Sequence, residues 1–305
     1  MSKPVVTFAT SADQPNLDVE EHPLLDAVAE RGMDPRVAVW DDPSVNWGDA
    51  GVVVVRGVRD YAQKRSQFIE WAGSIPRLLN QAPVLAWNTD KHYLQELEAR
   101  GLPTIPTTWL EPDAGLTKHQ VHCRFPAQGD FVVKPAISSG GRGTGRYTST
   151  DAKSRMEAIT HAVRQLRKGR TVMVQRYLET IDTAGEISLV FFNGLISHAV
   201  SKQAMLHPSF RSVEEVQRET AVQVREVTEA ERNFGERVRS VLHGYIKDTV
   251  GRDMQLLFNR IDLVPDGKGS FYVMEVSLID GSLYLGAVPQ AVGNFADAIA
   301  QRVFW

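Results

Sequence analysis

The chain has 305 residues, of which 43% are hydrophobic and 23% are charged, and its formal net charge is −3. This composition is typical of a soluble globular protein of two or three domains, and it excludes nucleic acid as the default partner because no basic surplus is present. No apolar run approaches the ~20 residues of a membrane span and no signal-peptide pattern is present, so we expect a cytoplasmic protein that makes no use of a membrane.

The first third of the chain alternates between strand and helix patterns. Apolar runs predict strands, and the amphipathic stretches between them predict helices. The expected strands are PVVTFAT, RVAVW, GVVVVR and PVLAW, and the expected helices are EEHPLLDAVAERG and YAQKRSQFIEWAGSI. This alternation predicts that residues 1–105 form a Rossmann-like α/β domain, with a parallel sheet covered by helices on both faces.

Polar side chains follow the points where these expected strands end. They are Trp40, Asp41, Asp42, Arg56, Asp60, Trp87 and Asn88. Ligands of parallel sheets bind at the carboxyl ends of the strands. We therefore expect the first domain to present its ligand-binding groups along this edge.

The proline-rich segment GLPTIPTTWLEPDAG marks a domain boundary. Beyond it, FVVK and TVMVQRYL are predicted strands on either side of a glycine-rich loop and a helix over residues 151–167. The single cysteine, Cys123, stands beside His119 and His122 in HQVHC, without an apolar pocket or a glycine elbow, so we interpret it as a loop thiol and not as a nucleophile.

The last part of the chain is predicted to contain antiparallel strands and two long helices. EISLVFFNGLISHAVSK is an expected hairpin because Asn193-Gly194 favours a two-residue turn. A polar helix is expected near 228–248, a second strand pair in FNRIDLVPDGKGSFYVMEVS, and a closing helix that ends at Trp305. Residues 207–227 are polar and irregular and form a candidate lid. The chain beyond residue 105 is therefore predicted to be α+β, divided into 106–178 and 179–305.

The stretch FVVKPAISSGGRGTGRY, residues 131–147, contains a candidate phosphate-binding loop. It lacks the GK[ST] ending of a Walker loop, and its glycines lie too far beyond the strand for a dinucleotide fingerprint. A flap that closes over a nucleotide fits better, although no kinase catalytic motif follows. Taken alone, the loop is either such a flap or an ordinary surface connection.

Two carboxylates in apolar strand patterns favour the nucleotide interpretation. Asp262 lies in FNRIDLV and Glu275 in YVMEVS, and the PDGKGS turn between them makes the two strands antiparallel neighbours. A carboxylate in such a strand is costly to bury unless it is paired or bound to a cation. Both can point to one face and bind Mg²⁺ together with phosphate oxygens. The alternative is that both acids lie in solvent at strand edges.

Basic residues accompany this pair of acids. Arg260 is two residues before Asp262 and therefore on the same face of the strand, where it could stabilise a transferred phosphoryl group. Lys91, Lys134 and Lys202 fall at the ends of predicted elements. A solvated surface position is the commonest alternative for lysine, but the place of Lys134 between an apolar strand and the glycine loop argues against it.

The order of these motifs resembles that of ATP-grasp ligases, the superfamily of D-alanine–D-alanine ligase and glutathione synthetase. The motifs are a lysine, Lys-Pro with a glycine-rich flap, VQRYL, GE, a lysine, RID and a final Glu. The resemblance covers nearly the whole chain and implies a Rossmann-like domain at 1–105 before an ATP-grasp fold of two α+β subdomains. It also implies ATP and Mg²⁺ as cofactors, and homodimers are common among similar ligases.

The resemblance implies a role for each matching residue of the nucleotide site. Lys91 and Lys134 would hold ATP phosphates beneath a flap formed by Ser138, Ser139, Gly140, Gly141 and Gly143. The adenine would lie against the hinge residues Gln175, Arg176, Tyr177 and Leu178. Glu186 would bind the ribose hydroxyls, with Asp182 as a substitute.

The resemblance also implies the catalytic and metal-binding groups. Lys134, Lys202 and Arg260 would act on the transferred phosphoryl group, and Asp262 and Glu275 would bind Mg²⁺. The third metal position, usually Asn or an acid, is Ser277 here. A serine hydroxyl is a weaker ligand, so a neighbour such as Asp280 or a water would complete one site, and the number of metal ions stays open.

The implied reaction is carboxylate activation, in which ATP converts a substrate carboxylate to an acyl phosphate that a nitrogen nucleophile then attacks. The substrate would be a small amino-acid-like carboxylate. Arg56 could clamp its carboxylate and Asp60 could hold its ammonium group, with Asp42 as a further substrate-binding candidate. Alternatively, Arg56 or Arg59 could form a local ion pair with Asp60 or Asp42.

Phrases such as VWDDPSVNW and LAWNTDKHYLQEL are similar to those of a subgroup of short bacterial ATP-grasp proteins. That subgroup includes cyclo-ligases that close O-ureido-D-serine into D-cycloserine. LIDGSLYL, residues 278–285, differs from the LIEPSLFL-like phrase common in the subgroup, a difference that could mark a specialised substrate. The alternatives left open are a dipeptide ligase, a small-molecule kinase and a non-catalytic nucleotide-binding regulator.

Overall fold

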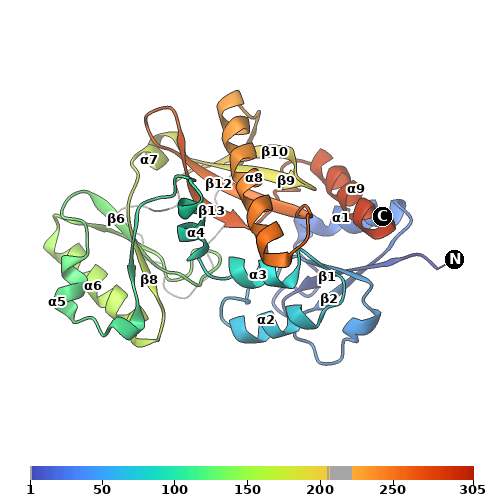
Figure 1. Ribbon diagram of the computed structural model, residues 1–305, viewed down its shortest axis with the longest axis horizontal. Helices are drawn as coiled ribbons and strands as arrows, with labels where there is room; N and C mark the ends of the chain where they lie inside the picture. Colours follow the sequence, from blue (N-terminus) through green and yellow to red (C-terminus); the bar gives the residue numbers. More distant parts are fainter. Residues whose placement is uncertain (1, 205, 207–221) are drawn as a thin grey trace.

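The computed structural model describes residues 2–204, 206 and 222–305, and the described residues form three β-sheets. Figure 1 shows the sheets side by side along the long axis of the molecule, with the N- and C-termini close together at one end. The α/β and α+β fold class expected from the sequence is confirmed.

The first sheet is parallel, as the alternation of apolar runs and helices predicts. It contains β1 (Val5–Thr10), β2 (Asp34–Val39), β3 (Val52–Val55) and β4 (Leu78–Leu79), in the order β2-β1-β3-β4. α1 (His22–Glu30) and α2 (Arg65–Ser74) follow β1 and β3 along the chain. The central strand β3 is VVVV and is buried along its whole length, because both faces of the sheet are covered.

The prediction that PVLAW forms a strand is wrong. These residues lie in α3 (Ala82–Asn88), which has a proline in its first turn, and the fourth strand is instead β4. A short apolar run cannot be assigned to strand or helix by periodicity alone, and here the proline at the helix start is the deciding feature. Trp87 and Asn88 therefore lie on a helix and not at a strand end, and α4 (Tyr93–Ala99) follows after a short turn.

The second sheet is antiparallel and small. It contains β5 (Thr107–Leu110), β6 (Asp130–Pro135), β7 (Gly145–Thr148) and β8 (Val172–Arg176), in the order β5-β8-β6-β7. α5 (Lys118–Cys123) and α6 (Ala152–Arg167) bury their apolar faces against it. The glycine-rich loop joins the neighbouring strands β6 and β7, so its position is set by a paired hairpin.

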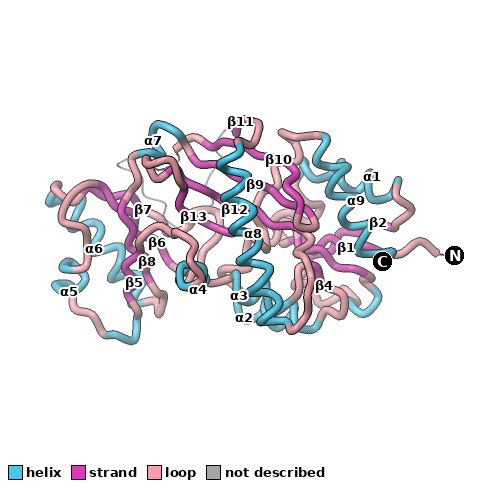
Figure 2. The backbone as a smooth tube through the Cα atoms, turned by 45° about the horizontal axis from the view of Figure 1, so that its top comes forward, coloured by secondary structure: helices cyan, strands magenta, loops and turns pink. Residues whose placement is uncertain are grey.

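The third sheet is also antiparallel, and both hairpins expected from the sequence are present. It contains β9 (Glu186–Phe192), β10 (Leu195–Lys202), β11 (Val222–Arg225), β12 (Phe258–Pro265) and β13 (Phe271–Ser277), in the order β11-β10-β9-β12-β13. α7 (Thr180–Ala184) precedes it, and α8 (Glu229–Val250) crosses it in both Figure 1 and Figure 2. Of the candidate lid 207–227, residues 207–221 lie outside the described residues, and the remainder includes the strand β11.

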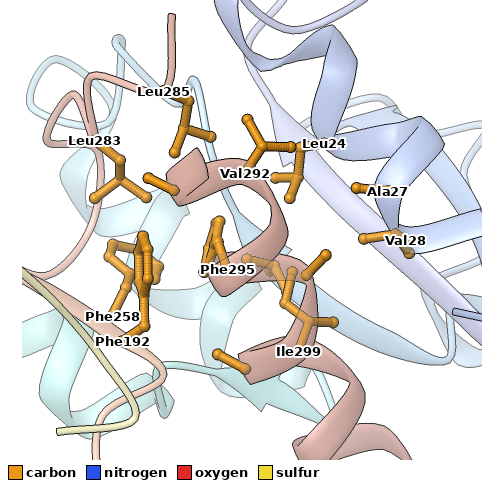
Figure 3. Packing of buried hydrophobic residues seen from close by; sticks show 14 of the residues in the cluster. Leu24, Ala27, Val28, Phe192, Phe258, Leu283, Leu285, Val292, Phe295 and Ile299 are labelled. Atoms are coloured by element: carbon orange, nitrogen blue, oxygen red, sulfur yellow. The ribbon is translucent and has the colours of Figure 1, made fainter. Parts of the chain in front are cut away.

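The final helix, α9 (Gln290–Phe304), joins the third sheet to the first domain. Its residue Phe295 stacks on Phe192 of β9, with ring centroids 4.6 Å apart. On its other side it packs against Leu24 and Val28 of α1, as Figure 3 shows. The residues expected as separate domains at 1–105 and 179–305 therefore share a hydrophobic core, while each of the three proposed ranges contains one sheet.

Candidate active site

A cavity of about 340 Å³ lies where the three sheets meet. The first domain contributes Arg56 and Tyr61, the second sheet contributes Lys134 and Gln175, and the third contributes Asp262 and Glu275. The volume lies in the range of small-molecule binding sites, and charged residues from all three sheet regions line the wall. The cavity thus unites most of the residues that the sequence predicts to be functional.

Asp262 and Glu275 face each other across β12 and β13. They are directly paired in the antiparallel register, so both carboxylates lie on the same face of the sheet, as the strand periodicity predicts. Asp262 is 1% exposed, which excludes the alternative of a solvated strand edge for this residue. Burial is the largest effect on Glu275 and opposes its ionisation, but the positive charges of Lys91, Lys134 and Arg260 together lower its pKa below the usual value.

Arg260 lies beside Asp262 on the same face of β12. Its Nε and Nη2 donate hydrogen bonds to the Asp262 carboxylate at 3.0 and 2.8 Å, and Ser188 Oγ donates a third at 2.5 Å. Burial would raise the pKa of Asp262, but Arg260 and then Lys202 lower it to about 2. Asp262 is therefore ionised at neutral pH.

Lys202 links this pair to the neighbouring strands. Its Nζ lies 3.0 Å from Glu186 Oε2 and 3.4 Å from Asp262 Oδ1. Lys202 and Glu186 are directly opposite each other in the β9–β10 hairpin. Burial alone would lower the pKa of Lys202, yet the two carboxylates raise it above its usual value, so the ammonium group keeps its charge.

Two lysines lie at the boundary between the second and third sheets. Lys91, in the turn between α3 and α4, donates to the Ser138 carbonyl at 2.9 Å and lies 3.4 Å from Glu275. Lys134, on β6, forms no ion pair with any carboxylate of the described residues. Burial and the like charge of Lys91 lower the pKa of Lys134 to about 8. An unpaired, desolvated ammonium group next to a second lysine is suited to bind an anion such as phosphate.

The glycine-rich loop closes over this part of the cavity and contacts the first domain. Gly140, Gly141 and Gly143 have φ angles of 59°, 67° and 71°, in the left-handed region that side chains disfavour. The carbonyl of Arg59 accepts hydrogen bonds from Ser139 Oγ at 3.0 Å and from Arg142 Nη1 at 2.7 Å. The loop is therefore positioned as a flap and is not a free surface connection.

The hinge residues Gln175, Arg176, Tyr177 and Leu178 line the cavity, as the resemblance implies. Met274 also lines the cavity and packs in one apolar cluster with Tyr177 and Leu178, and nothing in the sequence predicts it as a site residue. The register between β12 and β13 shifts after Asp262, which leaves Met274 as the extra residue of a β-bulge. A bulge redirects side chains, and the pattern of apolar residues in the sequence does not reveal it.

Asp182 does not line the cavity, contrary to its predicted role as a substitute for the ribose-binding acid. Its carboxylate accepts hydrogen bonds from Tyr177 Oη at 2.5 Å and from Arg146 Nη1 at 3.2 Å. The guanidinium of Arg146 also lies 3.5 Å from the centroid of the Tyr177 ring. Asp182 thus holds the hinge tyrosine in place, while Glu186 is the acid of this pair that lines the cavity.

Arg56 lines the cavity but is not available as the predicted carboxylate clamp. It is 2% exposed, its Nε donates to Glu21 Oε1 at 3.0 Å, and its Nη1 donates to the Gly281 carbonyl at 3.1 Å. Arg56 therefore forms an ion pair, the expected alternative to a substrate clamp, but its partner is Glu21 and neither Asp60 nor Asp42. Arg59, the other arginine considered, pairs with Asp18 at 3.0 Å.

Asp60 and Asp42 lie outside the residues that line the cavity, so the structure does not bring these two predicted substrate residues together with the rest of the site. Asp60 accepts a hydrogen bond from Trp40 Nε1 at 2.9 Å and pairs with Lys64 at 2.7 Å. Asp42 accepts hydrogen bonds from the backbone and side chain of Ser44. Both carboxylates organise the loops that follow strands, a role that strand-end position alone cannot distinguish from ligand binding.

Cys123 lies at the end of the helix α5, not in a loop, and is exposed. Its Sγ is 3.5 Å from His119 Nε2, and both residues lie outside the cavity. Among the helices formed by described residues, none combines the length and apolar character that a membrane crossing needs.

Taken together, the cavity wall can bind a polyphosphate and polarise a group transferred from it. Two lysines and a flap lie on one side, and two ionised carboxylates with Arg260 and Lys202 lie on the other. The described residues of the cavity include no cysteine or histidine that could serve as a nucleophile. This combination, on three sheets in this order, is that of an ATP-dependent carboxylate–amine ligase.

Comparison with known proteins agrees. Residues 105–254 match the family described as prokaryotic glutathione synthetase, ATP-grasp domain, and residues 6–80 match the N-terminal domain of the D-cycloserine synthetase DcsG. The cycloserine biosynthesis protein DcsG of Streptomyces lavendulae is 32% identical over 98% of this chain and 99% of its own. The chain belongs to the ATP-grasp ligase family and is an enzyme that forms C–N bonds.

Solved structures show the same fold. The crystal structure of D-cycloserine synthetase DcsG has a TM-score of 0.87 and 31% identity, over 98% of this chain and 99% of that one. A RimK domain ATP-grasp protein from Sphaerobacter thermophilus has a TM-score of 0.67 at 16% identity, over 99% of this chain and 100% of that one. D-alanine–D-alanine ligase from Bacillus anthracis has a TM-score of 0.64 at 14% identity, over 98% of this chain and 97% of that one.

Proposed function

We propose that this protein is the cyclo-ligase that closes O-ureido-D-serine into D-cycloserine, with ATP as the energy source and Mg²⁺ as its cofactor. The observation that carries the proposal is the match of residues 6–80 to the N-terminal domain of D-cycloserine synthetase. That segment contributes Asp18, Glu21, Arg56 and Tyr61 to the cavity wall, so it would help to bind the acceptor carboxylate. Similarity confined to the ATP-grasp domain would support only the reaction class.

The residues of the cavity fit a magnesium-bound polyphosphate. Asp262 and Glu275 are paired in register and favoured in the ionised state, which is the donor type that Mg²⁺ prefers. Ser277 lines the cavity two residues beyond Glu275 and would be the third ligand. When bound, the cation would neutralise phosphate charge and orient the transferred group.

Basic residues on both sides would then hold and polarise the phosphates. Lys91 and Lys134 would bind them beneath the flap residues Ser138 and Ser139, because Lys134 has no carboxylate partner among the described residues. Arg260 and Lys202, held by Asp262 and Glu186, would stabilise charge that develops on the transferred phosphoryl group. The closed flap would exclude water from an acyl phosphate that is prone to hydrolysis.

The adenosine would occupy the apolar part of the cavity. Gln175, Arg176, Tyr177, Leu178 and Met274 would enclose the adenine, with Glu186 placed for the ribose hydroxyls. The small-molecule substrate implies no macromolecular partner. A cytoplasmic location, where ATP is available, and a homodimeric state also belong to the proposal.

The test is ADP release with single substrates, followed by mass spectrometry of the products. We expect O-ureido-D-serine alone to support ADP release and to yield D-cycloserine, because ring closure needs no second substrate. ADP release only when two amino acids are supplied would indicate a dipeptide ligase. A stable phosphorylated product without a new C–N bond would indicate a kinase, and either result would contradict the proposed function.

A further inference from the structure

Asp280 lies on a cavity-lining loop that two arginines hold in place. Arg56 donates to the carbonyl of Gly281 at 3.1 Å, and Arg260 donates to the carbonyl of Ser282 at 3.1 Å. One arginine comes from the first domain and the other from β12, so the loop is tied to both sides of the cavity. A Cβ at Gly281 would lie 2.5 Å from the Cβ of Ser277, which shows how closely this loop packs on the end of β13.

The carboxylate of Asp280 differs from most others that line the cavity because it has no cationic partner. The paired carboxylates are those of Asp18, Glu21, Glu186, Asp262 and Glu275. Asp280, within the described part of the chain, forms no ion pair. It is therefore a carboxylate in the cavity that is not already committed to binding a protein cation.

The groups around Asp280 come from several elements, and some favour its ionised form while others oppose it. Arg56 and Arg59, after β3, favour the ionised form, Glu21 of the 3-10 helix η1 (Val19–Glu21) opposes it, and the Gly57 amide donates to it. Burial is the largest effect and raises the pKa of Asp280 to about 7. Tyr61 is also close, and burial together with the negative charges of Glu275 and Asp280 raises the pKa of its hydroxyl.

We propose that Asp280 is the base that accepts a proton from the nucleophilic nitrogen as the C–N bond forms. This inference rests on the proposed function. The nitrogen lone pair attacks the carbonyl carbon of the acyl phosphate, and the bond from that carbon to the phosphate oxygen breaks. Phosphate leaves with the electron pair, and the N–H proton passes to the Asp280 carboxylate. The C–N bond-forming step itself needs no further reactant and leaves the carbamoyl group on the ring nitrogen. Water then removes that group as CO2 and ammonia, which gives D-cycloserine.

This assignment separates the two halves of the reaction. Activation of the carboxylate depends on Lys134, Asp262 and Glu275, whereas Asp280 acts only when nitrogen attacks. A base whose pKa lies near the working pH is the most effective, and such a group contributes roughly 10²–10⁴-fold to a rate. The value for Asp280 meets this condition, while the low pKa of Asp262 makes it a poor proton acceptor.

The test compares two products of one enzyme, using Asp280→Asn with O-ureido-D-serine and Mg²⁺-ATP. Hydroxylamine, which is a neutral nucleophile and needs no base from the protein, traps the acyl phosphate as a hydroxamate. We expect Asp280→Asn to form hydroxamate within about threefold of the wild-type rate, and to form D-cycloserine at least about 100-fold more slowly. Asp280→Glu should recover part of the ring closure.

The pH profile gives a second readout that a structural role would not affect. Wild-type ring closure should fall below a pH near 7 as Asp280 becomes protonated, and hydroxamate formation should lack this limb. Asp113→Asn, in the exposed 3-10 helix η3 (Pro112–Ala114), is the matched control and should leave both rates unchanged.

Two outcomes would overturn the role of Asp280. Equal loss of hydroxamate and D-cycloserine in Asp280→Asn would mean that the carboxylate serves activation or folding. If Asp280→Asn needs a higher Mg²⁺ concentration but forms hydroxamate and D-cycloserine in the wild-type ratio, the carboxylate binds the cation. Failure of the wild-type enzyme to form either hydroxamate or D-cycloserine from O-ureido-D-serine would instead overturn the proposed function, and the base assignment with it.

Discussion

The two walls of the active-site cavity are constructed in different ways. On the third sheet, Asp262 and Glu275 are register partners on adjacent strands, and Arg260 is two residues away on the same face. On the opposite wall, Arg56 follows a strand of the first sheet and meets Glu21, which lies before α1. The first wall is formed by local strand geometry, and the second by contacts between distant segments.

This difference explains which residues the sequence could reveal. Side chains alternate between the two faces of a strand, and a short turn places two strands side by side. Charged groups in such a hairpin therefore come together whatever the rest of the fold is. An ion pair between residues far apart in sequence exists only after the sheets and helices have packed. The residues of the phosphate-binding wall, on the third sheet, can therefore be recognised as sequence motifs. The residues of the opposite wall, the acceptor wall formed around Arg56 and Glu21, cannot.

The largest expected effect is on the phosphate-binding wall. Lys134→Ala and Glu275→Ala should each reduce ADP release by at least about 1,000-fold, because each removes a charge that has no substitute at its position. A coupled ADP assay measures this loss, and circular dichroism should show an unchanged fold. Lys118→Ala, at an exposed helical position, is the control. Near-normal turnover in either variant would mean that the phosphates bind elsewhere.

The acceptor wall should respond in stability before it responds in nucleotide binding. Arg56→Ala leaves Glu21 buried without its cation and frees the Gly281 carbonyl, so we expect a loss of about 3–5 kcal/mol in the free energy of unfolding. Urea denaturation measures it. The exposed pair of Arg36 and Asp34 gives the control, where Arg36→Ala should cost less than about 1 kcal/mol.

Arg56→Ala also tests whether the two walls of the cavity act independently, provided that the purified variant is folded. The KM for ATP should stay close to the wild-type value, since Arg56 touches no predicted phosphate-binding residue. A large rise in that KM would show that the two walls act as one unit.

The two walls should also differ in their pH dependence of stability. The pKa of Asp262 is lowered to about 2, against about 3.9 in an unfolded chain. Its ionised form therefore contributes about 2–3 kcal/mol above pH 4, and this is lost as the pH falls from 4 toward 2. The pKa of Asp280 is raised to about 7, so its effect has the opposite sign, and stability falls as the pH rises from about 4 to about 7.

Urea titrations of wild type, Asp262→Asn and Asp280→Asn across these pH ranges test the signs. The stability advantage of wild type over Asp262→Asn should shrink as the solution becomes acidic. Asp280→Asn should gain on wild type between pH 4 and 7. Parallel curves for all three proteins would contradict both assignments.

The smallest effect is expected where the two walls meet at the flap. Arg142→Ala removes the hydrogen bond to the Arg59 carbonyl, a contact of about 1 kcal/mol, and should raise the KM for ATP about fivefold with little change in stability. Steady-state kinetics measures this change. Arg164→Ala, on an exposed position of α6, should leave the KM unchanged. An unaltered KM in Arg142→Ala would mean that the closed flap does not depend on this contact.

Particular residues show where sequence prediction succeeded and failed. Asn193-Gly194 and PDGKGS correctly predicted two hairpins, because turn chemistry is local. PVLAW fits a strand as well as a helix because it is a short apolar run, and the proline in its first turn favours the helix that it forms. Asp42 and Asp60 were placed in the substrate site because they follow strands, yet neighbouring side chains occupy both carboxylates.

The sequence by itself determined the class of chemistry. The motifs around Lys134, Arg260, Asp262 and Glu275 depend on strand alternation and short turns, which any fold containing those strands preserves. Only the tertiary structure decided that Glu21 neutralises Arg56, that a bulge turns Met274 into the cavity, and that Asp280 stands without a cationic partner. These contacts form between segments that are far apart in the chain, and a local sequence pattern does not show which distant segments pack together.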